Sequence, residues 1–157
     1  MVEEIHFSQS ESKENRYKEL LPQIKAVLSG ESDLIANQAN LCAILKEAFD
    51  FLWVGFYRVS SDELILGPFQ GPLACTRISR GKGVCVSAWE EAITLIVEDF
   101  DQFPGHIACS SKSRSEIVVP FFDARGVVIA VLDIDSVNLA AFDSTDRHYL
   151  EEIRSYF

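Results

Sequence analysis

Three cysteines stand where a thiol can do chemistry instead of filling a core. Cys75 and Cys85 lie in a stretch rich in glycine and proline, and Cys109 follows in the loop FPGHIACSS. Their spacings contain neither the close cysteine pair of a zinc site nor the C-x-x-C pair of thioredoxin. A thiolate that attacks an electrophilic oxygen or sulfur becomes a sulfenic acid, and a neighbouring thiol converts it to a disulfide. The pattern therefore favours a redox cycle with an attacking and a resolving cysteine; buried, unreactive thiols are the alternative.

The two later cysteines have neighbours that would favour the thiolate. Cys85 is expected in the first turn of a helix, where the helix dipole and free N–H groups stabilise negative charge. Cys109 is followed by Lys112 and Arg114, which would act in the same way if they fold beside it. Cys42 belongs instead to the apolar stripe of a predicted helix, and we expect it to be a small buried side chain.

Three acidic residues form a second group. Asp133 and Asp135 end the apolar strand VVIAVLDID, and residues two apart on a strand point to the same face. Glu116 opens the preceding strand, which a tight turn at 123–126 would place alongside. Three carboxylates facing one pocket could bind an ammonium or another cation. They could also supply a proton, because like charges raise the pKa of at least one of them. A solvated strand end is the alternative.

Two aromatic residues complete the candidate pocket. Trp53 and Tyr57 share one face of a predicted strand, where they could wall a pocket for an S-methyl group or fill an ordinary core. His106 is expected to form hydrogen bonds within its loop and not to act as a catalytic base. The tripeptide Gly-Lys-Gly at 81–83 could cradle an anion at a helix start, although this signal is weak without a complete phosphate-loop motif.

The elements that must position these residues are four helices and six strands. Apolar spacing predicts helices over 17–28 and 34–49, the second capped by Asp33, and further helices over 84–93 and 144–157. Strands are predicted at 52–60, 63–67, 73–78, 94–99, 116–122 and 127–135. This order does not alternate strand and helix, so it predicts an α+β fold with helices packed on a largely antiparallel sheet.

Two segments do not fit these elements. The loop at 99–114 has little periodicity, and loops of that length in a compact domain are usually functional or disordered. Residues 1–15 are polar, and we expect this N-terminus to be loosely ordered.

Composition narrows the class of protein. A chain of 157 residues fits one domain. A formal net charge of −10 argues against nucleic acid or anionic membranes as partners. The sequence has no apolar run of the about 20 residues that a membrane span needs, and its start lacks the features of a secretory signal. We therefore expect a cytoplasmic protein, in which clustered cysteines are more often catalytic than structural. The sequence does not fix the oligomeric state and leaves a homodimer open.

The chain resembles the free methionine-(R)-sulfoxide reductases, which are single-domain GAF proteins. The resemblance rests on the motifs GPFQGPLACTRI (67–78), GKGVC (81–85), FPGHIAC (103–109), SEIVVP (115–120) and IAVLDIDS (129–136). It covers most of the chain, and the combination is specific although each motif alone is weak. It implies a single GAF domain over 1–157, with a six-stranded antiparallel sheet and helices on its faces.

The resemblance also implies a reaction. Free L-methionine-(R)-S-oxide is reduced to L-methionine, which repairs oxidative damage, and the disulfide formed in the protein is reduced by thioredoxin. No metal or organic cofactor is implied. Cys109 matches the cysteine usually taken as the attacking thiol, with Cys85 as the second choice. Cys75 and Cys85 match the two candidates for the resolving thiol.

The acids and aromatic residues match binding positions of the same family. Glu116 and Asp135 match acids placed near the sulfoxide oxygen, and Asp133 matches the one that holds the ammonium. Trp53 matches the wall against the methyl group, and Tyr57 shares its strand face.

The chain departs from the family pattern at two places. Val86-Ser87 stands where many members have Gly-Thr, and Ser110 stands where they have Asp. Two other functions stay open: a GAF module that senses a small molecule without turnover, and a reductase of methionine sulfoxide within proteins. The three acids argue against the second of these, because they suit the free ammonium of an amino acid.

Overall fold

The protein is built on an antiparallel sheet, seen in a computed structural model that describes residues 4–9, 12–105 and 109–157. Within these residues the strands lie in the order β3-β2-β1-β6-β5-β4, and each neighbouring pair is antiparallel. The α+β class and the six antiparallel strands predicted from the sequence are confirmed. The strands are β1 (Trp53–Ser60), β2 (Glu63–Gln70), β3 (Arg77–Ser79), β4 (Leu95–Val97), β5 (Ser115–Phe122) and β6 (Val128–Ser136).

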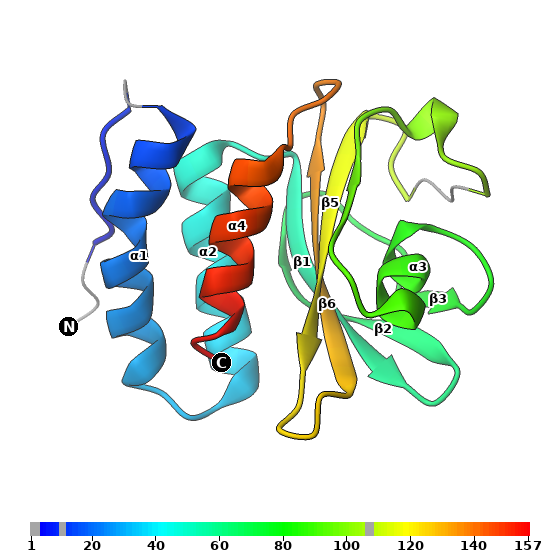
Figure 1. The fold of residues 1–157 in the computed structure, drawn as a ribbon, viewed down its shortest axis with the longest axis horizontal. Coiled ribbons are helices and arrows are strands. Elements are labelled where there is room, and N and C mark those ends of the chain that lie inside the picture. The colour runs from blue at the N-terminus through cyan, green and yellow to red at the C-terminus, as the bar shows by residue number, and fades with distance from the viewer. Residues whose placement is uncertain (1–3, 10–11, 106–108) are drawn as a thin grey trace.

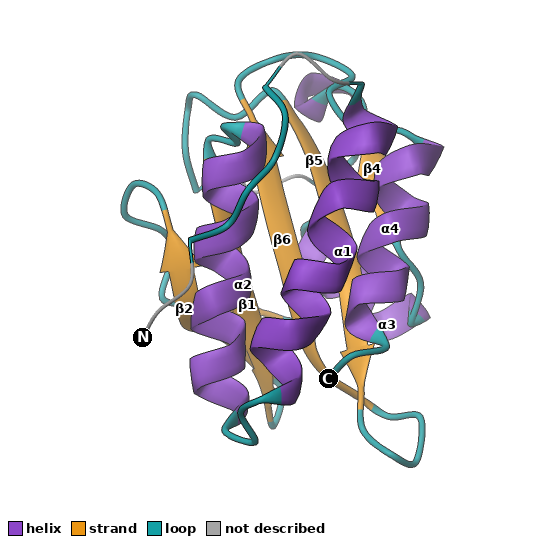
Figure 2. Ribbon diagram, turned by 90° about the vertical axis from the view of Figure 1, so that its left-hand side faces the viewer, coloured by secondary structure: helices purple, strands orange, loops and turns teal. Residues whose placement is uncertain are grey.

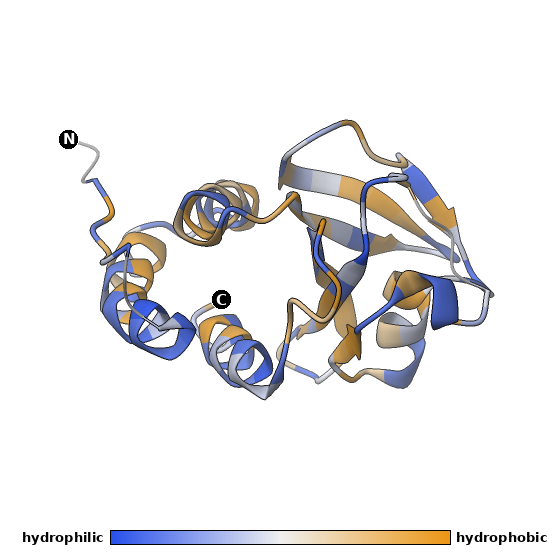
Figure 3. Ribbon diagram, turned by 90° about the horizontal axis from the view of Figure 1, so that it is seen from above, coloured by the Kyte–Doolittle hydropathy of each residue, from blue (hydrophilic) through white to orange (hydrophobic). Residues whose placement is uncertain are grey.

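Helices lie on both faces of this sheet. Three helices lie on one face of the sheet, and a shorter helix lies on the other face (Figure 1). The three-helix layer consists of α1 (Lys13–Ser29), α2 (Leu34–Phe49) and α4 (Ser144–Arg154). The shorter helix is α3 (Val84–Glu91). The turned view shows the three helices side by side in front of the sheet (Figure 2). Figure 3 shows them from above on one side of the sheet, with α1 farther from the strands than α2 and α4. None of the helices in the described residues has the length and apolar character needed to cross a membrane.

Side-chain alternation along the strands divides the interior into two cores. On β1, Val54 and Phe56 face the three-helix layer, whereas Trp53 and Tyr57 face the α3 side. Cys42 is fully buried in the helix-side core, as expected, and its thiol donates to the carbonyl of Pro68 at 3.5 Å. Burial raises the pKa of this thiol to about 12, so Cys42 has no part in the chemistry of the opposite face.

Some of the described residues in the segment 1–15 make defined contacts. Helix α1 already begins at Lys13, and the Ser12 hydroxyl caps it by accepting the amide of Asn15 at 3.2 Å. Further upstream, the Ser8 amide donates to Glu19 at 2.7 Å, and Ile5 packs against the helix-side core. The polar composition of this segment concealed these contacts, because its few apolar residues have no helical or strand spacing.

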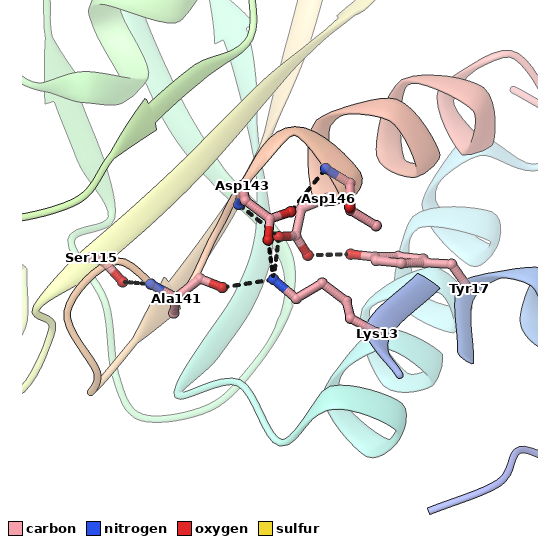
Figure 4. Close-up of polar contacts among 7 residues, drawn as sticks. Lys13, Tyr17, Ser115, Ala141, Asp143 and Asp146 are labelled. Atoms are coloured by element: carbon pink, nitrogen blue, oxygen red, sulfur yellow. Dashed lines mark hydrogen bonds and ion pairs between the residues drawn. The ribbon is translucent and has the colours of Figure 1, made fainter. Parts of the chain in front are cut away.

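A buried carboxylate joins the first and last helices to the sheet (Figure 4). Asp146 is fully buried; it accepts hydrogen bonds from the Tyr17 hydroxyl at 2.9 Å and from Lys13 Nζ at 2.6 Å. Lys13 Nζ also donates to the carbonyl of Ala141 at 2.9 Å, and the amide of Ala141 donates to the Ser115 hydroxyl at 3.2 Å. Ser115 is the first residue of β5. The network therefore ties α1 and α4 to the strand that carries Glu116.

Removing the cation from this network should destabilise the fold. In Lys13→Ala, Asp146 keeps its hydrogen bonds from the Tyr17 hydroxyl and the Asp143 amide but loses its partly buried ion pair, which we expect to lower the free energy of unfolding by about 2 kcal/mol. Lys18→Ala is the matched control, because Lys18 lies on the same helix and pairs with Glu14 at 2.8 Å in an exposed position. Urea unfolding of both variants measures the difference, and equal losses would contradict a structural role for the Asp146 network.

Candidate active site

A pocket opens on the α3 side of the sheet, between the strands and the loops above them. The floor consists of side chains from β1, β5 and β6, the start of α3 forms one wall, and two loops bring in sulfur atoms. The lining includes Trp53, Tyr57, Cys85, Cys109, Glu116, Asp133 and Asp135. Within the described residues, no lysine or arginine lines this pocket.

A disulfide joins Cys75 to Cys109 at the mouth of the pocket. The two residues are 34 positions apart in the chain, and their Cα atoms lie 5.6 Å apart. Cys75 is half-buried and Cys109 is exposed, so solvent and a reductant can reach the bond. The expectation that distant cysteines meet in space is therefore confirmed for this pair. Lys112 and Arg114 are exposed.

Cys85 is the third thiol of the site, but it is not the activated thiolate expected from its place in α3. It is a free cysteine and 5% exposed, and its thiol donates to Glu116 Oε1 at 3.8 Å. Burial raises the pKa of Cys85 well above its ordinary value, and the negative charges of Asp133, Glu116 and Asp135 raise it further. The prediction failed because these acids and the loss of solvent outweigh the effect of a two-turn helix.

Three carboxyl groups lie together on the pocket floor. Strand pairing sets Glu116 opposite Asp135 and Val118 opposite Asp133, so all three acids share one face. Glu116 is 4% exposed and Asp133 is 7% exposed, which rules out the alternative of a solvated strand end. Three of their oxygens are buried and have no hydrogen-bond partner among the described residues: Glu116 Oε2, Asp133 Oδ1 and Asp135 Oδ1. Such oxygens are available to donors on a bound molecule.

This crowding raises the pKa values of the acids. Burial, followed by the charges of Asp133 and Asp135, raises the pKa of Glu116 well above its ordinary value. Burial and the charge of Asp133 also raise the pKa of Asp135 well above its ordinary value, although a hydrogen bond from Ser113 lowers it in part. The pKa of Asp133 is also raised by burial. The three groups titrate together, and their raised pKa values favour a carboxyl group that holds a proton and can act as an acid.

The same cluster has donor atoms that suit a cation. Cys85 Sγ and one oxygen each of Glu116 and Asp133 lie within 4.8 Å of one another. These three could hold a metal ion, although a structural zinc site generally uses four ligands. The two carboxylates could equally accept hydrogen bonds from the ammonium of a ligand.

Two aromatic rings form the apolar part of the floor. The ring centroids of Trp53 and Tyr57 lie 5.8 Å apart, and both side chains are buried. The Trp53 ring lies over Gly55, where an added Cβ would come within 2.2 Å of Cη2 of the indole. Gly55 was missed in the sequence analysis, although a glycine inside a strand often marks a close approach of another group.

The remaining sequence candidates lie around this site or outside the described part of the chain. Gly83 caps α3 through its backbone, without a side-chain hydrogen bond, and it lines the pocket. Lys82 lines a separate shallow groove together with Cys75. His106 lies outside the described residues. Ser113, which is buried and hydrogen-bonded to Asp135, was not singled out from the sequence because an isolated serine carries no pattern.

Known proteins share this architecture and sequence. The profile of the GAF domain family matches residues 34–156. "Free methionine-R-sulfoxide reductase" from Saccharomyces cerevisiae is 36% identical over 97% of this chain and 89% of its own. The protein of the same name from Escherichia coli is 41% identical over 87% and 83%. The structure of free methionine-R-sulfoxide reductase from Neisseria meningitidis, in complex with its substrate, superimposes with a TM-score of 0.94 at 56% identity and covers 98% of this chain and 92% of that chain.

These matches span nearly the whole length of both partners and include the strands and loops that build the pocket. The chain therefore belongs to the GAF-domain family and, within it, to the free methionine-R-sulfoxide reductases.

Proposed function

We propose that this protein reduces free L-methionine-(R)-S-oxide to L-methionine with its own cysteine thiols. The observation that carries the proposal is the disulfide of Cys75 with the pocket residue Cys109, beside a floor that holds the buried Glu116 and Asp133 and the half-buried Asp135. The disulfide is the expected oxidised product of the reaction, and the acids suit both the proton and the ammonium that the reaction requires. The relatives named free methionine-R-sulfoxide reductase support the same activity.

Cys109 is the attacking thiol in this proposal. It is exposed, so its thiolate keeps contact with water, whereas burial and three acids oppose a thiolate at Cys85. Cys109 takes the sulfoxide oxygen and becomes a sulfenic acid, while the methionine sulfur is reduced to the thioether. A protonated Glu116 or Asp135 donates to the departing oxygen, because their raised pKa values keep a proton available.

Cys75 then resolves the sulfenic acid. Its thiolate attacks the sulfur of Cys109, the S–O bond breaks, and the oxygen leaves as water once it has gained a proton. The bond between these residues in the structure favours Cys75 over Cys85 as the resolving thiol. The exposed position of Cys109 would let a dithiol protein such as thioredoxin reduce the disulfide again in the cytoplasm.

The substrate would be held by charged and apolar side chains of the floor. Asp133 accepts the ammonium, with its free Oδ1 available for a hydrogen bond. Trp53 and Tyr57 form an apolar wall for the methyl group, and Glu116 and Asp135 lie near the sulfoxide oxygen.

Substitution of the disulfide cysteines should separate the two steps. Cys109→Ser should produce no methionine, because the attacking sulfur is gone. Cys75→Ser should produce about one methionine per chain and then stop, because the sulfenic acid cannot be resolved. Chromatography of methionine after mixing the protein with excess free sulfoxide and a dithiol protein such as thioredoxin, itself kept reduced, measures both, because repeated turnover needs this reductant. Cys42→Ala, in the other core, is the control that should retain parental turnover, and near-parental turnover by Cys109→Ser would remove Cys109 from the attacking role.

Proton donation by Glu116 should appear in the pH dependence of kcat/KM. A protonated Glu116 is present below its raised pKa and is lost as the pH rises through it, so parental kcat/KM should decline on the alkaline side. Glu116→Gln should lower kcat/KM by about 100-fold or more and remove this decline, since the amide does not titrate.

Steady-state kinetics across pH test this expectation. Glu98→Gln, an exposed position beyond β4, should keep the parental profile. An unchanged profile in Glu116→Gln would rule out Glu116 as the proton donor.

Recognition of the ammonium should exclude blocked substrates. N-acetyl-methionine-(R)-sulfoxide lacks the positive charge and should react with kcat/KM lower by about 100-fold, since an unpaired buried carboxylate is costly. In Asp133→Asn the difference between free and acetylated substrate should shrink, because the charge that selects the ammonium is removed. Competition between the two substrates measures this ratio, and a ratio that Asp133→Asn leaves unchanged would assign ammonium binding elsewhere.

A further inference from the structure

Two hydrogen-bond donors of β1 reach the loop that carries Cys75. The Tyr57 hydroxyl donates to the backbone carbonyl of Cys75 itself at 2.9 Å. The Trp53 indole Nε1 donates to the carbonyl of Pro72 at 3.1 Å. Both side chains rise from the same strand face, so the polar tips of the two pocket rings hold the loop at two points. These contacts are separate from the apolar contact that the same rings offer to a substrate.

The loop needs such support because it has no regular structure. It spans residues 71–76 between β2 and β3, and at its middle Leu73 is 90% exposed. At its far end the carbonyl of Thr76 accepts the amide of Leu66 at 3.0 Å. The position of the Cys75 sulfur relative to Cys109 therefore depends on how firmly this short segment is held.

Both donors are buried side chains whose protonated forms are favoured. Tyr57 is 2% exposed and Trp53 is 4% exposed. Gly71, at φ +133, leaves room for the indole, because a Cβ there would lie 2.8 Å from Trp53 Cδ1. Burial, with Asp133 next in effect, raises the pKa of Tyr57, and an indole N–H can only donate.

We propose that Tyr57, assisted by Trp53, is a positioning residue for Cys75 that sets the rate of disulfide closure through its hydrogen bond to the Cys75 carbonyl. The inference rests on the proposed function. In the step concerned, the Cys75 thiolate forms a bond to the Cys109 sulfenic sulfur, the S–O bond breaks, and hydroxide takes up a proton and leaves as water. Tyr57 touches no reacting atom in this step and acts through the backbone of Cys75.

The test compares Tyr57→Phe with the parent in a single turnover. Reduced protein is mixed with one equivalent of free methionine-(R)-sulfoxide, without external reductant, and quenched over time. Methionine is measured by chromatography, Cys109 sulfenic acid by dimedone capture, and the Cys75–Cys109 disulfide by peptide mass spectrometry. The loss of one hydrogen bond should slow disulfide closure by about five- to tenfold relative to methionine formation, so that captured sulfenic acid accumulates.

Two further variants give the limits with which the closure rate of Tyr57→Phe is compared. Cys75→Ser gives the upper limit, with sulfenic acid and no Cys75–Cys109 disulfide. Tyr156→Phe is the matched control, because its hydroxyl donates to Glu152 at 3.2 Å on the exposed end of the helical layer, and it should close the disulfide at the parental rate.

Amide hydrogen exchange of the reduced proteins gives a second measurement that does not depend on turnover. Exchange at residues 73–76 should be faster in Tyr57→Phe than in the parent. A parental ratio of closure to methionine formation in folded Tyr57→Phe, or unchanged exchange in this loop, would overturn the positioning role. If the parent itself forms no methionine, the proposed function fails as well.

Discussion

The constraint on which the site depends is the crowding of three carboxyl groups, two of them buried and one half-buried, on one sheet face. Glu116, Asp133 and Asp135 are brought together by the pairing of β5 with β6, and no lysine or arginine of the described residues lines their pocket. Isolated buried charge is costly, so the groups lower the cost by holding protons. The rest of the fold must supply the stability that this face does not, and the helix-side core and the Asp146 network do so on the opposite side.

Much of the frame could be predicted from local sequence because its signals are local. The alternation of β1, the Asp33 cap of α2 and the paired aspartates of β6 all follow from residues within a few positions of one another. The state of Cys85 could not be predicted in this way. Its pKa is raised first by burial and then by Asp133 and Glu116, which are distant in sequence and reach the thiol only through long-range strand pairing. The contact of the Trp53 ring with Gly55 likewise depends on a side-chain orientation, which the spacing of residues in the sequence does not predict.

Strand β1 contributes side chains to both faces of the sheet, because successive side chains alternate along it. Val54 and Phe56 anchor it in the helix-side core, which fixes the height and direction of Trp53 and Tyr57 on the other face. Each of these side chains has an apolar ring and one polar tip. The ring forms the floor and the tip bonds the Cys75 loop. Strand β1 thus fixes the distance between the apolar wall that would contact the methyl group and the loop whose cysteine forms the disulfide.

A reaction that needs a thiolate and a carboxylic acid at the same pH requires two different environments in one pocket. The burial and mutual repulsion that keep a proton on Glu116 act equally on a thiol beside it, and Cys85 shows this effect directly. A nucleophile placed among the acids would therefore remain protonated. The attacking sulfur has to come from the solvent side, on a loop where water supports the charge, while the acids remain on the buried strands. The exposed position of Cys109 and the buried position of Glu116 meet both requirements, and their separation follows from the electrostatics of the floor.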